Sequence, residues 1–313
     1  MEANDFSLGR VPHAVAKLAH GRGAVVAVRD AMGVGGAAER LLAGRWIAGP
    51  EARDALARTK RFNAVNIKTV INYLGEELAD ERAVADAERV YLSLIDMIRE
   101  SGARADISMK PSQLGLRINP DEASVRYGRI VARARDAGVF AWLDMERPED
   151  VDATISMYEG NPGGTGICVQ SYLRRSAADL ERLCSSGAIV RLVKGAYSAG
   201  PDIAFQSRLE TTKNYEMLMD YLFAHAREFV IATHDLDMIN RARSLNRERG
   251  RHVWYAMLSG IRNRYAAALA RENESVEIYV PFGPRWVDYS YRRLREASHL
   301  TLLIRSMASR QSI

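Results

Sequence analysis

Cysteine is scarce in this chain, which contains only Cys168 and Cys184. Two cysteines are too few to form a zinc cluster, and such low usage is typical of proteins that work in a reducing compartment. Both cysteines lie in apolar segments, and free cysteine is among the most buried residue types. We therefore expect two buried, unreactive thiols.

Long apolar runs and basic clusters are also missing. No run reaches the ~18 apolar residues that a membrane span needs, and the N-terminus lacks the charged and apolar regions of a signal peptide. The basic residues give a net charge of +5 but are scattered, without interleaved aromatics, so no nucleic-acid binding is expected. These absences predict a cytoplasmic protein. Its net positive charge is compatible with a peripheral attraction to the anionic inner face of the cell membrane.

The chain of 313 residues is 47% hydrophobic and 27% charged, which fits one large α/β domain with a substantial core. Residues 1–60 are expected to form an N-terminal helical segment, and residues 61–313 a catalytic domain. Within the first segment, Gly33–Ala38 matches the G-x-G-x-x-A dinucleotide fingerprint. That fingerprint needs a strand, a tight turn and a helix, whereas the next convincing strand starts near Val65, so a flexible turn is favoured.

From Val65 onward, short β-rich segments alternate with longer helical ones. The expected strands are Val65–Tyr73, Asp106–Met109, Val139–Asp144, Gly166–Gln170, Ile189–Val193, Phe229–Ala232, His252–Met257 and Val276–Val280. The expected helices lie near residues 80–100, 121–137, 148–159, 176–186, 203–226, 235–249 and 261–272, and a last one follows the eighth strand. Eight strand–helix units over about 240 residues predict a (β/α)8 barrel. A doubly wound open sheet is the alternative.

Chemically capable side chains collect at the C-terminal ends of these strands. In chain order they are Glu76, Lys110, Asp144, Glu146, Gln170, Tyr172, Lys194, Tyr197, Thr233, His234, Asp235 and, on the eighth strand, Tyr279. In a barrel these strand ends meet at one mouth, where the sites of such enzymes lie. The distribution predicts an active site at that mouth.

Arg191 and Lys194 lie at the end of a strand that should be buried, and Gly195 follows them. Buried cations need an anionic or electron-rich partner, and a glycine lets the backbone approach a cofactor closely. The alternative is a pair of salt bridges to barrel carboxylates such as Asp144. His234 also lies at a strand end, but no second histidine or cysteine stands at metal-ligand spacing, so no metal is expected.

The stretch Tyr289–Glu296 reads as a helix. Tyr289, Arg292, Arg293 and Glu296 share one of its faces, at the i, i+3, i+4 and i+7 positions. Two neighbouring guanidinium groups aimed at one point are suited to binding a carboxylate or a phosphate. The alternative is a solvated basic face with an Arg292–Glu296 pair.

Seven segments, taken together and in order, resemble the proline dehydrogenase family over about residues 45–298. They are Tyr73-Leu-Gly-Glu76, Ile107-Ser-Met-Lys110, Leu143-Asp-Met-Glu146, Val169-Gln-Ser-Tyr172, Val190-Arg-Leu-Val-Lys-Gly-Ala-Tyr197, Ala232-Thr-His234 and Tyr289–Glu296. The resemblance implies a distorted (β/α)8 barrel that holds FAD at its mouth and a last helix that closes over the substrate. It also implies oxidation of L-proline to Δ1-pyrroline-5-carboxylate, with electrons passed to a quinone or another acceptor.

The resemblance also implies roles for individual residues. The substrate carboxylate would be bound by Arg292, Arg293 and Lys110, and the substrate ring would lie between Tyr279 and Tyr289. The site would be organised by Asp144 and Tyr197. Glu76 would pair with Arg292 as a gate, and Glu296 is the last residue assigned to the substrate site. The flavin contacts would be Gln170, Arg191, Lys194, Gly195, Thr233 and His234.

The chain departs from the family at four places. Ser198 stands where many relatives have an aromatic, Asp235 where asparagine is usual, and Ala297 where asparagine is usual. The seventh strand reads Trp254–Leu258 where relatives read close to Glu-Phe-Gln-x-Leu. Because side chains alternate along a strand, Trp254 and Ala256 share a face; if they point inward, FAD should be held more loosely than is usual. Two alternatives follow: a different cyclic imino acid such as hydroxyproline, or a non-catalytic binding or regulatory protein.

Overall fold

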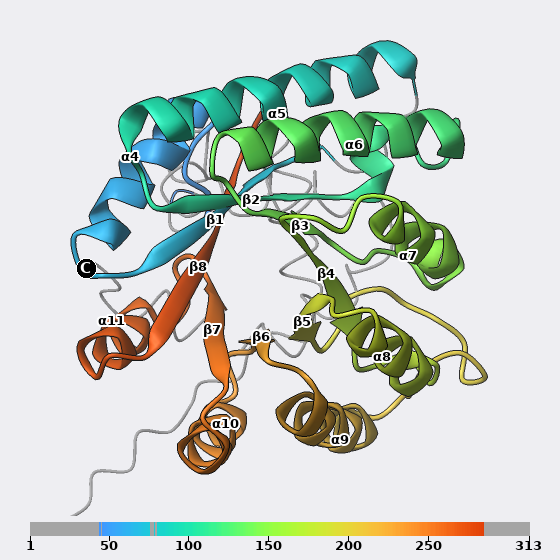
Figure 1. Cartoon of the computed structure of the whole chain (residues 1–313), viewed down its shortest axis with the longest axis vertical. Coiled ribbons are helices and arrows are strands. Elements are labelled where there is room, and N and C mark those ends of the chain that lie inside the picture. Colours follow the sequence, from blue (N-terminus) through green and yellow to red (C-terminus); the bar gives the residue numbers. More distant parts are fainter. Residues whose placement is uncertain (1–43, 45, 76–77, 79, 285–313) are drawn as a thin grey trace, which may run out of the picture.

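Eight parallel strands form a closed barrel in the computed structural model, which describes residues 44, 46–75, 78 and 80–284 (Figure 1). Neighbours pair in chain order, and β8 closes the barrel by pairing with β1. The strands are β1 (Lys68–Tyr73), β2 (Ala105–Met109), β3 (Ala141–Leu143), β4 (Thr165–Gln170), β5 (Ile189–Val193), β6 (Glu228–Ala232), β7 (His252–Leu258) and β8 (Ser275–Phe282). The predicted (β/α)8 architecture is confirmed, and the open-sheet alternative is wrong.

Helices connect consecutive strands and surround the barrel (Figure 1). They are α5 (Glu81–Ser101), α6 (Pro120–Asp136), α7 (Val151–Glu159), α8 (Ser176–Ser185), α9 (Arg208–His225), α10 (Leu236–Arg249) and α11 (Asn263–Arg271). Two short 3-10 helices, η1 (Pro111–Leu114) and η2 (Pro148–Asp150), follow β2 and β3, and α4 (Ala52–Asn63) precedes β1 and packs on β1 and β8. The division of the chain at residue 60 stays a prediction.

Local sequence signals set where several helices begin. Asp80 accepts a hydrogen bond from the backbone N–H of Ala83 at the start of α5, at 2.8 Å. Ser207 and Glu210 form a reciprocal capping box at the start of α9. Such caps satisfy backbone donors that have no partner within the helix, so they fix the residue at which the helix starts.

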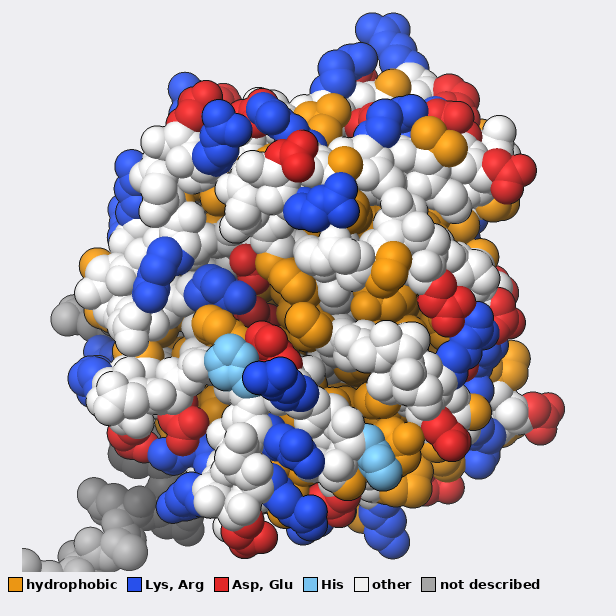
Figure 2. Space-filling view, viewed as in Figure 1, with side chains coloured by type: hydrophobic (Ala, Val, Ile, Leu, Met, Phe, Trp, Pro, Cys, Tyr) orange, Lys and Arg blue, Asp and Glu red, His pale blue; other side chains and the backbone are white. Residues whose placement is uncertain are grey.

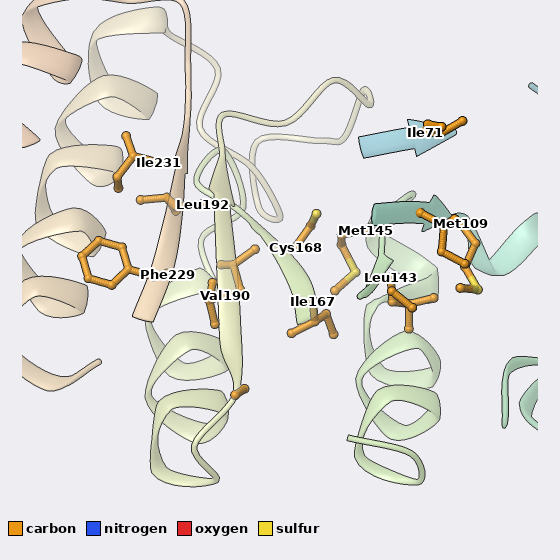
Figure 3. Packing of buried hydrophobic residues seen from close by; sticks show 14 of the residues in the cluster. Ile71, Met109, Leu143, Met145, Ile167, Cys168, Val190, Leu192, Phe229 and Ile231 are labelled. Atoms are coloured by element: carbon orange, nitrogen blue, oxygen red, sulfur yellow. The ribbon is translucent and has the colours of Figure 1, made fainter. Parts of the chain in front are cut away.

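The main hydrophobic core lies between the strands and the surrounding helices. It contains outward-facing strand residues such as Ile107, Ile167, Val190 and Phe229, each fully buried. Figure 3 shows three of them, Ile167, Val190 and Phe229, on the neighbouring strands β4, β5 and β6. This layer removes a large apolar area from water and supplies the main stabilisation of the fold.

A second, smaller cluster lies inside the barrel. Val70, Trp142, Val230 and Ala256 form it, and Trp254 packs against it. Tyr255, by contrast, is fully buried in the outer core. Trp254 and Ala256 therefore point into the barrel, which is the orientation for which looser FAD binding is expected.

Charged side chains cover the outer surface of the helices. Figure 2 shows basic and acidic groups interspersed on one face of the molecule. Several are paired, such as Arg175 with Asp152 and Arg241 with Asp220. Exposed pairs of this kind contribute little to stability, so the fold depends on its core and on its buried polar groups.

Some predicted features lie outside the described residues. They are the fingerprint-like stretch 33–38, most of the N-terminal segment, Glu76 and the helix expected over Tyr289–Glu296, including Arg292, Arg293 and Glu296.

Gly166 in β4 offers a test of the packing inside the barrel. An added Cβ would collide with the Trp142 ring and lie 2.9 Å from the backbone oxygen of Ile189. Because displacing the backbone costs energy, we expect Gly166→Ala to lower the free energy of unfolding by about 1–3 kcal/mol. Gly163→Ala, where the added Cβ would meet only an arginine side chain at 3.6 Å, is the control. Equal stability of the two variants in urea unfolding would contradict this packing.

Candidate active site

Asp144 lies directly after β3 and accepts hydrogen bonds from five side chains, of which the longest comes from Cys168 Sγ to Oδ1, at 3.5 Å. Its Oδ1 accepts from Ser108 Oγ at 2.7 Å and from Arg191 Nη2 at 2.8 Å. Its Oδ2 accepts from Lys110 Nζ at 2.7 Å and from Tyr279 OH at 2.8 Å. One buried carboxylate thus joins side chains from β2, β4, β5 and β8 and from the loop after β2.

The strand geometry explains this convergence. Ser108 and Lys110 are two positions apart, so they share the inward side of β2 and the start of its loop. The backbone N–H of Asp144 donates to the carbonyl of Met109 at 2.9 Å, which extends the β2–β3 pairing to the carboxylate. As in other barrels, the C-terminal ends of the strands bring their side chains to one mouth.

The carboxyl group of Asp144 is held ionised. Burial by itself would raise its pKa, but the adjacent charges of Lys110 and Arg191 outweigh that effect and hold the pKa well below its usual range. The hydrogen bonds from Lys110 and Ser108 act in the same direction. Two cations therefore meet at one fixed carboxylate, which makes the mouth a favourable place for a further anion.

Arg191 is buried and reaches groups on several strands. Its Nε donates to Cys168 Sγ at 3.2 Å, and its Cζ lies 4.5 Å from the centre of the Trp142 ring. Its Nη1 lies 3.7 Å from a carboxylate oxygen of Glu277. The alternative of a salt bridge between Arg191 and Asp144 is thus confirmed. It does not exclude a cofactor, because the guanidinium group remains at the barrel mouth.

Gln170 lies at the end of β4, and Gly195 lies close to its side chain in the loop after β5. Gln170 Nε2 donates to the carbonyls of Met145 at 2.7 Å and Glu146 at 2.9 Å, while its Oε1 is buried and accepts no hydrogen bond from any described residue. Gly195 has a φ of +101°, and an added Cβ would lie 2.6 Å from a ring carbon of Tyr172. The unsatisfied oxygen of Gln170 is suited to a ligand that donates a hydrogen bond, whereas at Gly195 the close approach of the Tyr172 ring requires a residue without a side chain.

Thr233, His234 and Lys194 lie beside one another at the ends of β5 and β6. Thr233 Oγ1 accepts from the backbone N–H of Asp235 at 3.1 Å, and His234 Nε2 accepts from the backbone N–H of Leu258 at 3.3 Å. Lys194 Nζ lies 3.2 Å from Asp235 Oδ2. Burial acts to raise the pKa of Asp235, but the charge and the hydrogen bond of Lys194, together with backbone hydrogen bonds, outweigh it and lower that pKa. The cation predicted to contact a cofactor is therefore paired here with one of the residues that depart from the family.

Tyr197 reaches the mouth through Glu146. Its hydroxyl donates to Glu146 Oε1 at 3.4 Å, and the same carboxylate accepts from the backbone N–H and the hydroxyl of Ser112, each at 2.8 Å. Glu146 is buried. The carboxylate thus fixes Tyr197 against η1, which follows β2.

Several residues that contribute to this site were not among those predicted. Ser108, Trp142, Cys168 and Glu277 all point toward Arg191 or Asp144. Ser108 and Cys168 each lie two positions before a predicted site residue, Lys110 and Gln170. Strand alternation could therefore have identified both. The expectation of two buried thiols is confirmed for Cys168, whose pKa is raised by burial to about 11, but it is wrong for Cys184, which is only partly buried.

The part of the chain that the structure describes contains no group of three or more histidine, cysteine, aspartate or glutamate side chains arranged to hold a metal ion. Within the same residues, no helix combines the length and the apolar character required to span a membrane.

Comparisons with known proteins agree on one family. The family model described as Proline dehydrogenase matches residues 55–301. Proline dehydrogenase 1 of Bacillus subtilis subsp. natto is 29% identical over 263 residues, which cover 82% of this chain and 87% of the relative. Proline dehydrogenase of Deinococcus radiodurans is 29% identical over 268 residues, which cover 82% of this chain and 86% of the relative.

A solved structure shares the fold. Proline utilization A (PutA) from Bdellovibrio bacteriovorus superposes with a TM-score of 0.75 at 19% identity. The match covers 86% of this chain but only 34% of that protein, so this chain spans about a third of the length of PutA. At this identity the likeness concerns the barrel fold.

Asp144→Asn tests the central carboxylate. The substitution leaves Lys110 and Arg191 without their shared counter-charge, and removal of one partner of a buried ion pair typically costs about 3–5 kcal/mol. We expect a loss of this size in the free energy of unfolding, measured with urea at neutral pH. Asp220→Asn breaks the exposed pair with Arg241, whose side chains are 47% and 44% exposed, and should cost at most about 1 kcal/mol.

The same pair of proteins tests the charge state of Asp144. A carboxyl group whose pKa is lowered by folding stabilises the protein fully above its unfolded pKa of about 3.9, and that stabilisation is lost as the pH falls further. The stability gap between the parent and Asp144→Asn should hold from neutral pH to about pH 5 and narrow below about pH 4. A gap that already shrinks near neutral pH would show that the carboxyl group is not held ionised.

Proposed function

The chain belongs to the proline dehydrogenase family and is an oxidoreductase that acts on proline, and we propose that it converts L-proline to Δ1-pyrroline-5-carboxylate with FAD as its cofactor. The observation that carries the proposal is the network around Asp144, which holds Lys110, Arg191 and Tyr279 together at the barrel mouth. In this arrangement Lys110 is the cation that would bind a substrate carboxylate.

The residues present fit a flavin. Gln170 Oε1 is a buried acceptor that no described residue satisfies, and a flavin ring system carries N–H donors. Thr233, His234 and Lys194 lie at the ends of the neighbouring strands, where they could contact the rest of the cofactor. When bound, FAD supplies the chemistry of hydride acceptance from the carbon next to the substrate nitrogen. Gln170, Arg191, Lys194, Gly195, Thr233 and His234 are the residues that would hold it.

The other mouth residues bind and orient the substrate in this proposal. Lys110 binds the substrate carboxylate while Asp144 fixes the position of its ammonium group, 2.7 Å away. Tyr279 walls the ring of the substrate, and its hydroxyl is held by the same carboxylate. Nearby cations disfavour a protonated amine, so the substrate nitrogen is kept in the neutral form that oxidation requires. Tyr197, fixed through Glu146, completes this side of the site.

The last helix is assigned the rest of the substrate site. Arg292 and Arg293 bind the substrate carboxylate together with Lys110, Tyr289 covers the ring opposite Tyr279, Glu296 lies on the same helix face, and Glu76 pairs with Arg292 as a gate. The spacing of these residues along the sequence and the family motif support the assignment.

We further propose that the electrons pass to a quinone or a comparable carrier. The net charge of +5 supports a weak, peripheral association with anionic lipid at the inner face of the cell membrane, where a quinone is found. In this view the enzyme works in the cytoplasm.

The direct test is the visible absorbance spectrum of protein expressed with ample riboflavin. We expect a flavin spectrum that L-proline bleaches in the absence of oxygen, and faster bleaching by L-proline than by hydroxyproline. Gln170→Leu should weaken FAD retention by the value of one hydrogen bond, about 0.5–1.5 kcal/mol, which is roughly a 2- to 10-fold rise in Kd. Colourless protein that takes up no added FAD would refute the cofactor, and flavin that L-proline fails to bleach would refute the substrate.

Arg292→Met and Arg293→Met test the carboxylate clamp. Each substitution removes one cation that pairs with the substrate carboxylate, which should weaken L-proline binding by about 2–5 kcal/mol. The flavin content should stay near that of the parent, because neither arginine is assigned to the cofactor. Turnover at the parental rate and KM in either variant would contradict the assignment.

A further inference from the structure

Glu277 is a buried carboxylate whose environment the site described above does not explain. It lies on β8, two positions before Tyr279, so it faces the barrel interior one layer deeper than that tyrosine. The residue is 1% exposed, and neither of its carboxylate oxygens has a hydrogen-bond partner among the described residues. Leaving a buried carboxylate without hydrogen bonds is costly, so some other interaction must compensate.

The charges around Glu277 identify that interaction. Its two oxygens lie 3.7 Å from Arg191 Nη1 and 3.8 Å from Lys68 Nζ. Lys68 makes its shorter contact with Asp106, at 2.6 Å, and its ammonium group also lies over the Trp254 ring. Lys68 therefore interacts mainly with Asp106. Glu277 acts electrostatically on Arg191, from the side of the barrel interior.

These ion pairs form one continuous chain through the barrel. In order it contains Lys110, Asp144, Arg191, Glu277, Lys68 and Asp106. These six residues are three cations and three carboxylates, so their charges balance only when all three carboxylates, Glu277 included, are ionised. Asp144 holds Arg191 from the mouth, and Glu277 holds it from the interior.

We propose that Glu277 is a positioning residue that sets the charge Arg191 presents to the flavin. This inference rests on the proposed function, because it assumes that Arg191 faces the cofactor. A positive charge beside a flavin favours the charge that the flavin gains on reduction. The carboxylate of Glu277 offsets part of the charge of Arg191 and thereby lowers the reduction potential of the bound cofactor.

Burial makes the effect depend on pH. Burial raises the pKa of Glu277, and the nearby carboxylate of Asp106 acts in the same direction, against the opposing charges of Lys68 and Arg191. The other strand beside it presents Ala256, which carries no charge. Protonation of Glu277 therefore removes the offset as the pH falls, and ionisation restores it as the pH rises.

The test is the midpoint potential of bound FAD, measured from acidic to alkaline pH by anaerobic titration with a reference dye. Glu277→Gln keeps the shape of the side chain but not its charge, so its potential should lie above that of the parent at high pH and converge with it at low pH. Glu277→Asp keeps the carboxylate but, being one methylene shorter, moves it away from Arg191, so the midpoint potential should rise by a smaller amount. Coincident potentials of the parent and Glu277→Gln at every pH would overturn the proposal.

A matched control removes a carboxylate that lies close in sequence but outside the barrel. Glu274 pairs with Arg243 at 2.7 Å, and Glu274→Gln should leave the potential unchanged. If Glu277→Gln does not fold, Glu277→Met should give the same sign of shift, because it also removes the negative charge beside Arg191. If neither neutral variant folds, Glu277→Asp decides alone, and a potential equal to that of the parent overturns the proposal.

A measurement without cofactor separates this inference from the proposed function. The Trp142 ring lies 4.5 Å from Arg191 Cζ, so a shift of the guanidinium group should change the near-ultraviolet circular dichroism of flavin-free protein. Glu277→Gln should alter this signal and Glu274→Gln should not. If the circular dichroism signal of Glu277→Gln is unchanged, the positioning role is contradicted, even where the parent binds no flavin. If the parent fails to bind FAD, only the proposed cofactor is refuted.

Discussion

The architecture of the barrel mouth depends on one buried carboxylate with two cationic partners. Asp144 accepts hydrogen bonds from Lys110, Arg191, Tyr279 and Ser108, and no apolar side chain could replace this function. The cost of burying the carboxylate is offset because both oxygens are satisfied and both cations lie within direct contact. Side chains that begin on different strands are thereby held in one fixed arrangement before any ligand arrives, which is what catalysis by positioning requires.

The same interaction links the mouth to the barrel interior. Arg191 contacts Asp144 on one side and Glu277 on the other, and its guanidinium group stacks on Trp142. Because the interior of the barrel is shielded from water, charges there are weakly screened and act on one another over several ångströms. The layer below the mouth is therefore part of the site's electrostatics, although it touches no substrate.

The sequence predicted the fold well because strand alternation and helix periodicity are local signals. All eight strands and the helices between them lie within a few residues of their expected positions. Lys110, Asp144 and Gln170 were predicted because they stand at or directly after strand ends, which the closed barrel brings together at one mouth.

Other features could not be predicted from local patterns. The partners of the charges depend on register and side-chain direction: Lys194 pairs with Asp235, and Lys68 with Asp106. Glu277 lies within an otherwise apolar strand, where one carboxylate carries no local signal of its role. The roles of Tyr289, Arg292, Arg293, Glu296 and Glu76 stay predictions, since these residues lie outside the described part of the chain.

A double-mutant cycle between Asp144 and Arg191 tests most directly whether this pair organises the site. The free energy of unfolding is measured for the parent, Asp144→Asn, Arg191→Met and the double variant. Residues that share a buried ion pair should show a coupling energy of about 0.5–3 kcal/mol, so that the double variant is less destabilised than the sum of the single ones. Additivity within about 0.3–0.5 kcal/mol would show that the two residues act independently and would contradict the account.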